Sequence, residues 1–439
     1  MKLLRALKLR RFALLFFGQT VSRVGDHLYQ LALAWWVLEK TGSALDMGTV
    51  MICSFMPMLI FLVVGGVAVD RLPRVGIMVV SDVARGLLVL MVAALALANR
   101  LTVLEVYVAS VLFGLVDAFF TPAYTAVLPD LVPEEQLNSA NALTSLSMQL
   151  GRIAGPPLAA LLIHFGGTGW AFGLNAVSFG VSALFLLPLL GKTGRRAMPE
   201  ETVGGLAEQG AERSMAAAGA GDGEEVVLVS EAPPVAGRFA ILAEARAGIG
   251  YVLSRPWLWV TILTCTAANV LLGGPYSVTL PFLIQKTRGA DVGTLALVYA
   301  MFPIGYALAA VTSGQMERLP RRGLTIFVCM AMGGLALGLF GLPVPLVVLC
   351  AAAIVNGYAL EIAGLAWTHV MQEKVPSDML GRVSSIDSLG SYAILPVGYA
   401  LAGWATDALS PAWVFLIGGF STAVLAVAGL MSRSIRRLK

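Results

Sequence analysis

Long apolar stretches dominate this sequence and limit the folds that it can adopt. A membrane-spanning helix needs roughly 20 mainly apolar residues, and about twelve such stretches follow one another along the 439 residues. Hydrophobic residues make up 58% of the chain and charged residues 13%, whereas a soluble chain is typically about 45–50% apolar and about 25% charged. The sequence therefore predicts an all-α membrane protein that crosses the bilayer many times.

The apolar stretches form two sets of six, separated by a long polar segment. The first six lie near residues 11–38, 46–69, 76–98, 102–127, 139–164 and 169–190. The second six lie near residues 258–284, 292–315, 323–342, 344–370, 380–405 and 412–432. This division predicts an N-terminal bundle over residues 1–190, a cytoplasmic linker over 191–257 and a C-terminal bundle over 258–439.

Lysine and arginine are distributed unevenly among the connections between these stretches. One side of the membrane would carry 23 of them, and the other only Lys40, Arg100, Lys286 and Arg288. Cytoplasmic segments carry the excess of basic residues, so both termini are predicted to be cytoplasmic. The basic N-terminus lacks a signal-peptide cleavage site, and we expect it to be retained.

The segment between the two sets changes in composition. Residues 200–237 are rich in Gly, Ala and Glu without apolar periodicity, which predicts a disordered linker. Before Pro256, the stretch FAILAEARAGIGYVLSRPWLW predicts a short amphipathic helix on the inner membrane surface. The four cysteines lie in apolar runs without the spacing of a metal or redox site, so we predict no metal and no cofactor.

A short charged sequence, which we call the loop phrase, occurs twice in the chain in nearly the same form. VDRLPR aligns Asp70 with Glu317 of MERLPRR, 247 residues later, and both copies lie between the second and third stretch of their set. VPEEQL and VPSDML repeat at an offset of 243, and Pro156 and Pro396 at 240. Three landmarks in one order predict two six-helix halves in parallel orientation, an arrangement that many secondary transporters share.

With these features the sequence resembles the major facilitator superfamily over essentially the whole chain except the linker. The family's loop signature stands here as Gly66-Val-Ala-Val-Asp70-Arg71-Leu-Pro-Arg74. Three stretches resemble the drug and macrolide exporters of that superfamily: GQTVSRVGDHLYQLALAWWVLEKTGSA, TPAYTAVLPDLVPEEQLNSANAL and LGRVSSIDSLGSYAILPVGYALAG. Siderophore exporters share much of the pattern. The resemblance implies twelve transmembrane helices in two six-helix bundles, with a substrate cavity between them.

The loop phrase suggests a gate on the cytoplasmic side. Asp70 is placed to accept hydrogen bonds from the N-terminal end of span eleven and to pair with Arg382, while Arg74 can pair with Asp130. The simpler interpretation, topogenic charges beside a tight turn, explains the arginines but not the carboxylate. The predicted gate residues are Gly66, Asp70, Arg71, Arg74, Asp130, Arg382 and Asp387, with Glu317, Arg318 and Arg321 in the second copy.

Several carboxylates lie deep within the predicted spans. An ionisable group in hydrocarbon is costly and usually faces a cavity or a partner. Spans one, four, seven and ten line the cavity in the superfamily, so Asp26, Asp117 and Glu361 are expected to face it. A carboxyl group in a poorly hydrated cavity can hold a proton near neutral pH and release it to other water, which proton antiport requires. The alternative is a carboxylate permanently paired with an arginine such as Arg152.

Span five contains a pattern similar to the superfamily's antiporter motif. Gly151, Arg152, Gly155 and Pro156 fit it in part, although two alanines replace its last glycines and the arginine is unusual. Small residues four apart let helices approach closely. The residues predicted to line the substrate cavity are Asp26, Trp35, Phe119, Asn269, Tyr276 and Glu361; for each aromatic, lipid contact or helix packing is the alternative.

Together these features predict a transporter and not an enzyme. We expect a monomeric exporter of lipophilic or cationic small molecules in a bacterial-type inner membrane, driven by protons and surrounded by lipid, with no nucleic-acid partner. Macrolide or multidrug efflux follows from the resemblance alone. The alternatives are a siderophore, metabolite or lysophospholipid carrier on the same fold, and a membrane sensor that transports nothing.

Overall fold

Every regular element in the described part of the chain is a helix. The computed structural model describes residues 4–190, 238–314 and 321–438. The first half contains, besides short 3₁₀ turns, α1 (Arg10–Thr41), α2 (Ala44–Arg71), α3 (Arg74–Leu97), α4 (Val103–Leu131), α5 (Leu137–Gly166) and α6 (Thr168–Leu186). Each of the six apolar stretches expected between residues 11 and 190 therefore contains one helix.

The second half begins after the part of the linker that lies outside the described residues. Its helices are α8 (Arg238–Leu253), α9 (Pro256–Ala268), α10 (Leu280–Phe282), α11 (Val292–Ser313), α12 (Arg322–Gly338), α13 (Leu346–Lys374), α14 (Ser377–Ala393), α15 (Leu395–Ala408), α16 (Pro411–Leu430) and α17 (Arg433–Arg436). The helix expected before Pro256 is present as α8. The disorder expected for residues 200–237 concerns residues outside the described ones.

Ten helical segments are long and apolar enough to cross a membrane, so the chain is a multi-pass membrane protein. The expectation of twelve is met only in part. The helix α1 is not among the ten, and it carries Arg23 and Asp26. Span eleven was expected to be continuous, but it is divided at Ile394 into α14 and α15, of 17 and 14 residues. Pro396 follows the break and cannot donate a backbone hydrogen bond, which explains why the helix restarts there.

The seventh expected span is also irregular. Between α9 and the loop at Arg288, π-helical turns cover Asn269–Gly273, Pro275–Thr279 and Leu283–Thr287. Each π turn accommodates an extra residue and is frequent at functional sites. The two prolines of this span, Pro275 and Pro281, lack the backbone N–H that a regular α-helix would use.

Local capping explains where the helices start and stop. Gly42 ends α1 with a left-handed φ of 64°, which glycine adopts without strain. Ser43 then caps α2 by accepting a hydrogen bond from the backbone of Asp46 at 3.2 Å. Thr102 and Glu105 form a capping box at the start of α4. These short, polar turns allow consecutive helices to run antiparallel.

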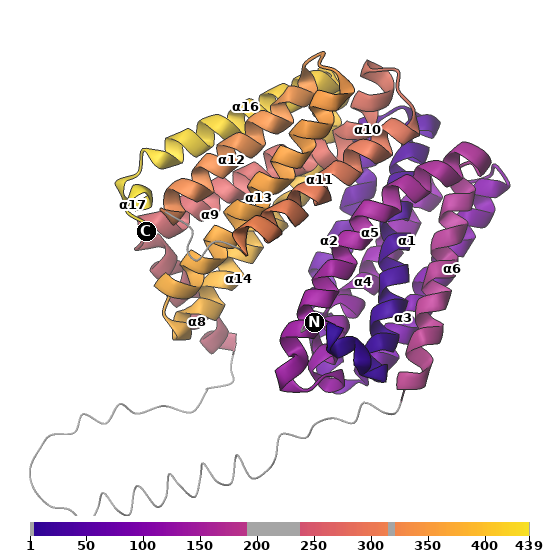
Figure 1. The fold of residues 1–439 in the computed structure, drawn as a ribbon, viewed down its shortest axis with the longest axis horizontal. Coiled ribbons are helices and arrows are strands. Elements are labelled where there is room, and N and C mark those ends of the chain that lie inside the picture. Colours follow the sequence, from indigo (N-terminus) through magenta and orange to yellow (C-terminus); the bar gives the residue numbers. More distant parts are fainter. Residues whose placement is uncertain (1–3, 191–237, 315–320, 439) are drawn as a thin grey trace, which may run out of the picture.

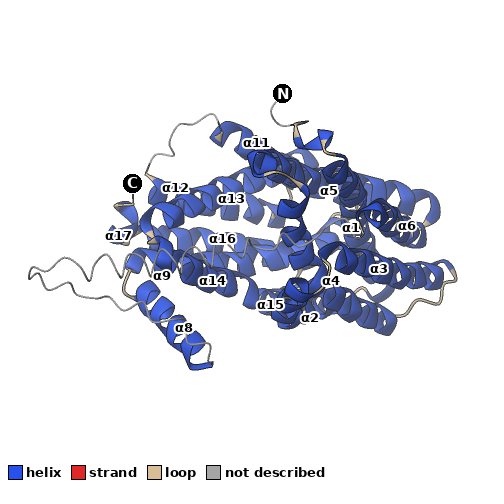
Figure 2. Ribbon diagram, turned by 90° about the horizontal axis from the view of Figure 1, so that it is seen from below, coloured by secondary structure: helices blue, strands red, loops and turns tan. Residues whose placement is uncertain are grey.

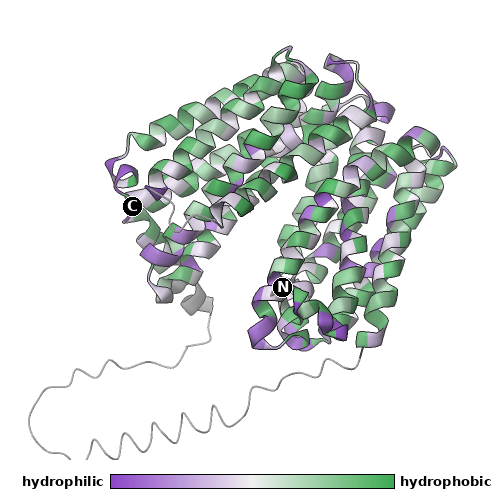
Figure 3. Cartoon of the chain, viewed as in Figure 1, coloured by the Kyte–Doolittle hydropathy of each residue, from purple (hydrophilic) through white to green (hydrophobic). Residues whose placement is uncertain are grey.

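The two halves repeat the same helix pairing. In the first half α2 packs on α4 and α3 on α6; in the second, α11 packs on α13 and α12 on α16. Figure 1 shows the halves side by side, and Figure 2 shows them meeting where α15 lies beside α2 and α11 beside α5. The hydropathy colours in Figure 3 are largely apolar along both sets of helices, as expected for surfaces in contact with lipid.

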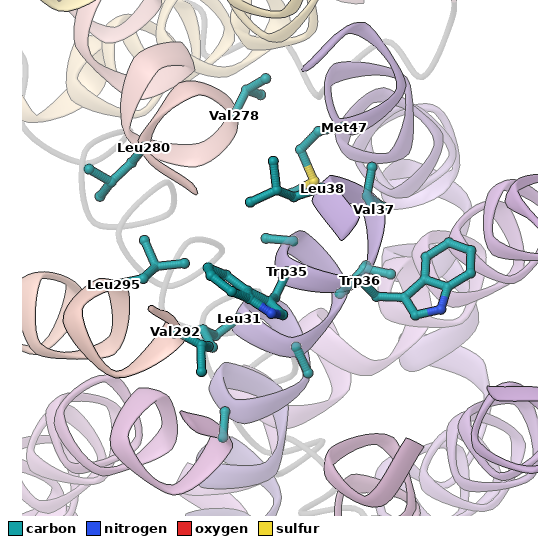
Figure 4. Close-up of a cluster of buried hydrophobic side chains, with 14 of the residues drawn as sticks. Leu31, Trp35, Trp36, Val37, Leu38, Met47, Val278, Leu280, Val292 and Leu295 are labelled. Atoms are coloured by element: carbon teal, nitrogen blue, oxygen red, sulfur yellow. The ribbon is translucent and has the colours of Figure 1, made fainter. Parts of the chain in front are cut away.

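The ribbons converge at one end of the molecule and diverge at the other (Figure 1). We call the end where α6 stops and α8 starts the linker end, and the end at the α1–α2 turn the far end. One apolar core cluster spans both halves at the far end and includes Leu31, Trp35, Val278 and Leu295 (Figure 4). Four other clusters of buried residues, one in the first half and three in the second, stay within their own half. Shared apolar packing therefore joins the halves mainly at the far end.

Candidate functional site: the cavity between the halves

A cavity of about 680 Å³ lies between the two halves. Nine segments contribute to its lining: α1, α2, α4 and α5 in the first half, and span seven, α11, α12, α13 and α15 in the second. Its polar lining residues are Asp26, His27, Tyr29, Gln30, Ser54, Ser110, Asp117, Arg152, Asn269, Tyr276, Ser277, Tyr299, Tyr306, Asn356 and Tyr399. A largely apolar cavity with a few convergent polar groups is the usual form of a small-molecule site.

Two carboxylates form an acidic wall of this cavity. Asp26 comes from α1 and Asp117 from α4. The Oδ1 atom of Asp26 is buried, and no hydrogen-bond partner reaches it among the described residues. The charged groups that act electrostatically on Asp26 are Arg85, Asp117, Asp82 and Arg23. Burying an anionic oxygen without a hydrogen-bond partner costs free energy.

Asp117 is held by a buried arginine. Arg85 Nη1 donates to Asp117 Oδ1 at 2.9 Å, and Arg85 Nη2 donates to Asp82 Oδ1 at 2.5 Å. Arg85 is 2% exposed and Asp82 is fully buried. Ser182 donates to the second oxygen of Asp82 at 2.7 Å, and the Arg85 guanidinium lies 4.0 Å from the centre of the Phe120 ring. This network links α3, α4 and α6 within the first half.

The Arg85 network is the functional feature that sequence reasoning missed. Arg152 was considered as the arginine that pairs with a cavity carboxylate, but the partner of Asp117 is Arg85. A signal was present, because Asp82 and Arg85 stand three apart in one apolar span, where oppositely charged side chains lie on one helical face.

The GxxxG pattern of α5 packs against α1. A Cβ atom on Gly151 would lie 3.0 Å from the carbonyl oxygen of Arg23, and one on Gly155 would lie 2.7 Å from the Cβ of His27. The two glycines therefore let the helices approach closely. The same stretch turns Arg152 and Pro156 toward the cavity, which both residues line.

The second half supplies an aromatic wall. Tyr299, Phe302 and Tyr306 follow at the spacing of one face of α11, and Tyr276 comes from the π-helical part of span seven. The Tyr276 ring centre lies 5.1 Å from that of Tyr299 and 4.6 Å from that of Phe302, both in edge-to-face contact. Asn269 lines the cavity one π turn earlier in the chain.

Three of the residues expected in the cavity lie elsewhere in the structure. Trp35 is 5% exposed within the far-end core, and its indole nitrogen donates to Glu39 at 2.7 Å. Phe119 lines a separate apolar pocket of about 370 Å³ bounded by α3 and α4. Glu361 is half-buried on α13 beside the cavity-lining Leu360, and it acts electrostatically on Tyr306. Asp26, Asn269 and Tyr276 do line the cavity.

At the linker end, the ion pair expected between Arg74 and Asp130 forms. Arg74 Nη1 donates to Asp130 Oδ2 and to the carbonyl oxygen of Ala126, both at 2.8 Å. Asp70 and Arg71 lie exposed at the end of α2. Asp387, expected in the gate, accepts a hydrogen bond from the indole of Trp367 at 3.0 Å within its own half.

The two neighbouring glycines before the loop phrase differ in their surroundings. Gly66 has open space where a Cβ would stand, whereas a Cβ on Gly65 would overlap the carbonyl oxygen of Ala118. The glycine that allows α2 to pack on α4 is therefore Gly65.

In the second copy of the phrase, Glu317 and Arg318 lie outside the described residues. Arg321 precedes α12 with a left-handed φ of 41°, and its neighbour Arg322 forms the ion pair with Glu373 of α13. This pair corresponds to Arg74–Asp130 with a shift of one residue, because the second copy contains an additional arginine.

The halves are joined by polar contacts at the far end. Asp407, at the end of α15, accepts hydrogen bonds from Ser43 Oγ at 3.0 Å and from the backbone N–H groups of Ala44 and Leu45 at 2.9 Å each. A carboxylate at a helix N-terminus is favoured by the helix dipole and by unpaired N–H groups. Lys286 of the second half also donates to the carbonyl oxygen of Gly42. We call the Asp407 contacts the far-end latch.

Close backbone packing accompanies the latch. A Cβ on Gly48 of α2 would lie 2.6 Å from the carbonyl oxygen of Tyr399, and one on Gly403 of α15 would lie 2.7 Å from that of Ala44. Nearby, the Thr294 N–H and hydroxyl donate to Asp291 and hold the pKa of that carboxyl below its usual value. The far end is thus closed by both apolar and polar contacts.

Among the described residues, no cluster of three or more His, Cys, Asp or Glu side chains could hold a metal ion. The polar groups of the cavity are suited to binding an organic ligand or a proton.

Comparison with known proteins agrees with this architecture. The family model of the Major Facilitator Superfamily matches residues 15–392 and, in a second match, residues 262–438. The chain belongs to the Major Facilitator Superfamily. It is therefore a member of a transporter family and not of an enzyme family. The second match begins near the start of span seven, which agrees with the internal repeat.

Relatives with assigned names are exporters. The chain is 27% identical over 427 residues to the "Enterobactin exporter EntS" of Citrobacter koseri, covering 95% of this chain and 90% of the relative. It is 26% identical over 426 residues to the protein of the same name from Escherichia coli O139:H28, with the same coverage.

Solved transporter structures share the fold. A bacterial homologue of the iron transporter ferroportin, in an inward-facing state, matches with a TM-score of 0.68 at 15% identity, over 96% of this chain and 98% of that one. The nucleoside transporter NupG matches with a TM-score of 0.66 at 13% identity, over 98% of this chain and 100% of that one.

Proposed function

We propose that this protein is a secondary active exporter of a small organic molecule, which it moves by alternating access and in exchange for protons. The observation that carries the proposal is the cavity of about 680 Å³, lined by both halves and containing Asp26 and Asp117. Relatives named as exporters support the outward direction. The fold neighbours include a transporter in an inward-facing state.

The proposed topology has twelve spans with both termini in the cytoplasm of a bacterial-type inner membrane. The helix α1 and the divided α14–α15 pair would be the two spans beyond the ten that length and composition support. The linker end then faces the cytoplasm, in accord with the excess of lysine and arginine on that side. The protein is proposed to act as a monomer, with one bundle over residues 1–190 and one over 258–439.

The halves would rock about the cavity, so that the two ends open in turn. In the structure the far end is closed by the Asp407 contacts, which would make this an inward-facing state in the proposed topology. In the opposite state, we propose that Asp70 and Arg382 help to close the linker end together with the Arg74–Asp130 pair. Arg321, Arg318 and Glu317 would do the same in the second half.

For proton coupling we propose Asp26 first, with Asp117 and Glu361 as the other candidates. Because one oxygen of Asp26 has no hydrogen-bond partner, we expect this carboxyl group to bind a proton when the cavity is poorly hydrated. Asp117 is partly compensated by Arg85, so its protonation would cost a buried ion pair. A substrate that displaces the proton from Asp26 would link the two fluxes.

Two substrate classes fit this proposal. A siderophore-type substrate follows the names of the relatives, and a lipophilic drug follows the aromatic and methionine lining with its adaptable surface. The siderophore class is proposed first. Secretion measurements separate the two: loss of the protein would lower siderophore in the medium in one case and raise dye accumulation in cells in the other.

The transport experiment uses purified protein in proteoliposomes with an internal pH dye. A pH gradient is imposed, and siderophores, macrolides and lipophilic cations are added one at a time. We expect substrate-dependent proton flux in the wild type and its loss in Asp26→Asn. Asp46→Asn is the matched control, because Asp46 accepts a hydrogen bond from Tyr107 at 2.8 Å and does not line the cavity.

Each outcome bears on a different part of the proposal. Proton flux that survives Asp26→Asn would move the coupling site to Asp117 or Glu361. Substrate flux without proton flux would refute antiport while leaving export intact. Ligand binding without any flux would indicate a sensor and overturn the proposed function.

A further inference from the structure

Arg152 is an uncompensated cation in the cavity. It lines the cavity from α5 and is half-buried. Within the described residues, no hydrogen bond or ion pair reaches its guanidinium group. Arg85, another arginine near the cavity, is by contrast paired with two carboxylates. A guanidinium offers five N–H donors in a planar fork, and a cavity that leaves all of them free is suited to an anion.

The surroundings of Arg152 come mainly from the aromatic wall. Its guanidinium carbon lies 6.0 Å from the centre of the Tyr306 ring, and its field also reaches Tyr276 and Glu361. Tyr299 uses its hydroxyl to donate to the backbone of Tyr276 at 3.0 Å. No hydrogen bond within the described residues involves the hydroxyls of Tyr276 or Tyr306, so both can donate to a ligand.

The cavity is divided by charge. Asp26 and Asp117 form the acidic wall on α1 and α4, and Arg152 is not among the charged groups that act on Asp26. The acidic wall is balanced in part by Arg85 and Arg23, whereas the acidic group that Arg152 acts on is Glu361, with which it forms no ion pair within the described residues. A negatively charged ligand group is therefore attracted to the Arg152 side and repelled from the Asp26 side.

We propose that Arg152, Tyr276 and Tyr306 form a subsite for the anionic group of an aromatic small molecule, a carboxylate or a phenolate. The guanidinium would pair with the anion, the tyrosine hydroxyls would donate to it, and the rings of Tyr276 and Phe302 would contact the aromatic part. This inference rests on the proposed function, because it takes the cavity as the substrate site. It adds that the preferred substrate is an aromatic anion and not a lipophilic cation.

The test measures binding directly and does not depend on transport. The full-length protein is purified in detergent and titrated by calorimetry with 1-naphthoate and with 1-naphthylmethylammonium, which share a ring system and differ in charge. Cyclohexanecarboxylate tests the aromatic requirement. The variants are Arg152→Gln, Arg152→Lys and, as a matched control, Arg255→Gln, since Arg255 lies over the Tyr251 ring and does not line the cavity.

We expect the wild type to bind 1-naphthoate at least tenfold more tightly than the ammonium probe and than cyclohexanecarboxylate. Arg152→Gln should weaken 1-naphthoate binding at least tenfold without weakening binding of the ammonium probe. Arg152→Lys should retain part of the affinity, and Arg255→Gln should change it less than threefold.

Equal affinity of the wild type for both charges would overturn the inference, even if Arg152→Gln does not fold. So would unchanged 1-naphthoate binding in a folded Arg152→Gln variant. Flux in proteoliposomes together with either result would leave the proposed function standing. Selective 1-naphthoate binding without flux would instead support the subsite and refute export.

Discussion

In the proposed alternating-access cycle, the far-end latch predicts that one carboxylate controls the balance between the two states of the cavity. Asp407 accepts three hydrogen bonds from the start of α2, on the opposite half of the protein. These contacts must break when the far end opens. The variant Asp407→Asn keeps the size of the side chain but removes its charge and one acceptor oxygen, so it should favour the state in which the far end is open.

The magnitude follows from the geometry. A hydrogen bond to a charged group contributes about 1.5–3 kcal/mol and a neutral one about 1 kcal/mol, and a charge at a helix N-terminus adds about 0.3–1 kcal/mol. Asp407 is exposed, and solvent screening reduces these contributions. We expect a shift of about 1–2 kcal/mol, which corresponds to roughly a five- to thirtyfold change in the equilibrium between states.

Distance measurements between spin labels provide the assay. The four native cysteines, Cys53, Cys265, Cys329 and Cys350, are first replaced. Labels at Arg100 and Leu342, in far-end loops of the two halves, report the separation of that end. Asp46→Asn serves as the control, because it removes a charge from the first turn of α2 without touching the other half. The reasoning is refuted if Asp407→Asn leaves the distance distribution of the wild type unchanged, or if the control shifts it equally.

Three further predictions concern stability. Gly65→Ala should destabilise the protein by about 1–3 kcal/mol, because the added methyl group would overlap the carbonyl oxygen of Ala118, whereas Gly66→Ala should be tolerated. Thermal unfolding in detergent compares the two variants. Equal losses of stability would contradict the packing argument. Arg85→Gln should lower the stability of the protein by about 3–5 kcal/mol in the same measurement, because it leaves buried carboxylates unpaired. An unchanged Tm would show that the network is dispensable. Asp291→Ala should lower stability at pH 7 by about 1 kcal/mol through loss of a helix cap. Because the folded-state pKa of Asp291 is depressed, its contribution is present at neutral pH and is lost as the pH falls through that lower value. A difference in Tm that is as large below the folded-state pKa as at pH 7 would rule this out.

Much of the fold could be predicted because membrane helices are recognised in a sequence by their length and hydropathy. The helices lie where apolar runs of the required length occur, and the repeated loop phrase indicated the pairing of the two halves. The interruptions were harder to predict. Prolines occur in the fifth span as well as the eleventh, yet α5 continues through Pro156 whereas the eleventh span restarts before Pro396. Only the packing of neighbouring helices decides whether the freed carbonyl is accommodated.

The sequence predicted which types of residue form the candidate site, but it did not predict which side chains pair with one another. That Asp26 would face a cavity followed from its place in the first span. The pairing of Asp117 with Arg85 did not, because it depends on the rotation of α3 relative to α4. Likewise, periodicity does not distinguish Trp35, which is buried in the core, from Tyr276, which lines the cavity. Side chains that bridge two helices require the helix–helix geometry that a single sequence leaves undetermined.

The two parts of the divided eleventh span pack against different partners. Below Ile394, α14 packs against α8 and α9, with Gly248 of α8 close to Arg382 and Ile386; above it, α15 packs against α2 and carries the latch. A displacement of α8 therefore acts on α14, while α15 stays bound to the other half. Because no continuous helix joins α14 to α15 across Ile394, α14 can change its tilt without a change in the Asp407 contacts.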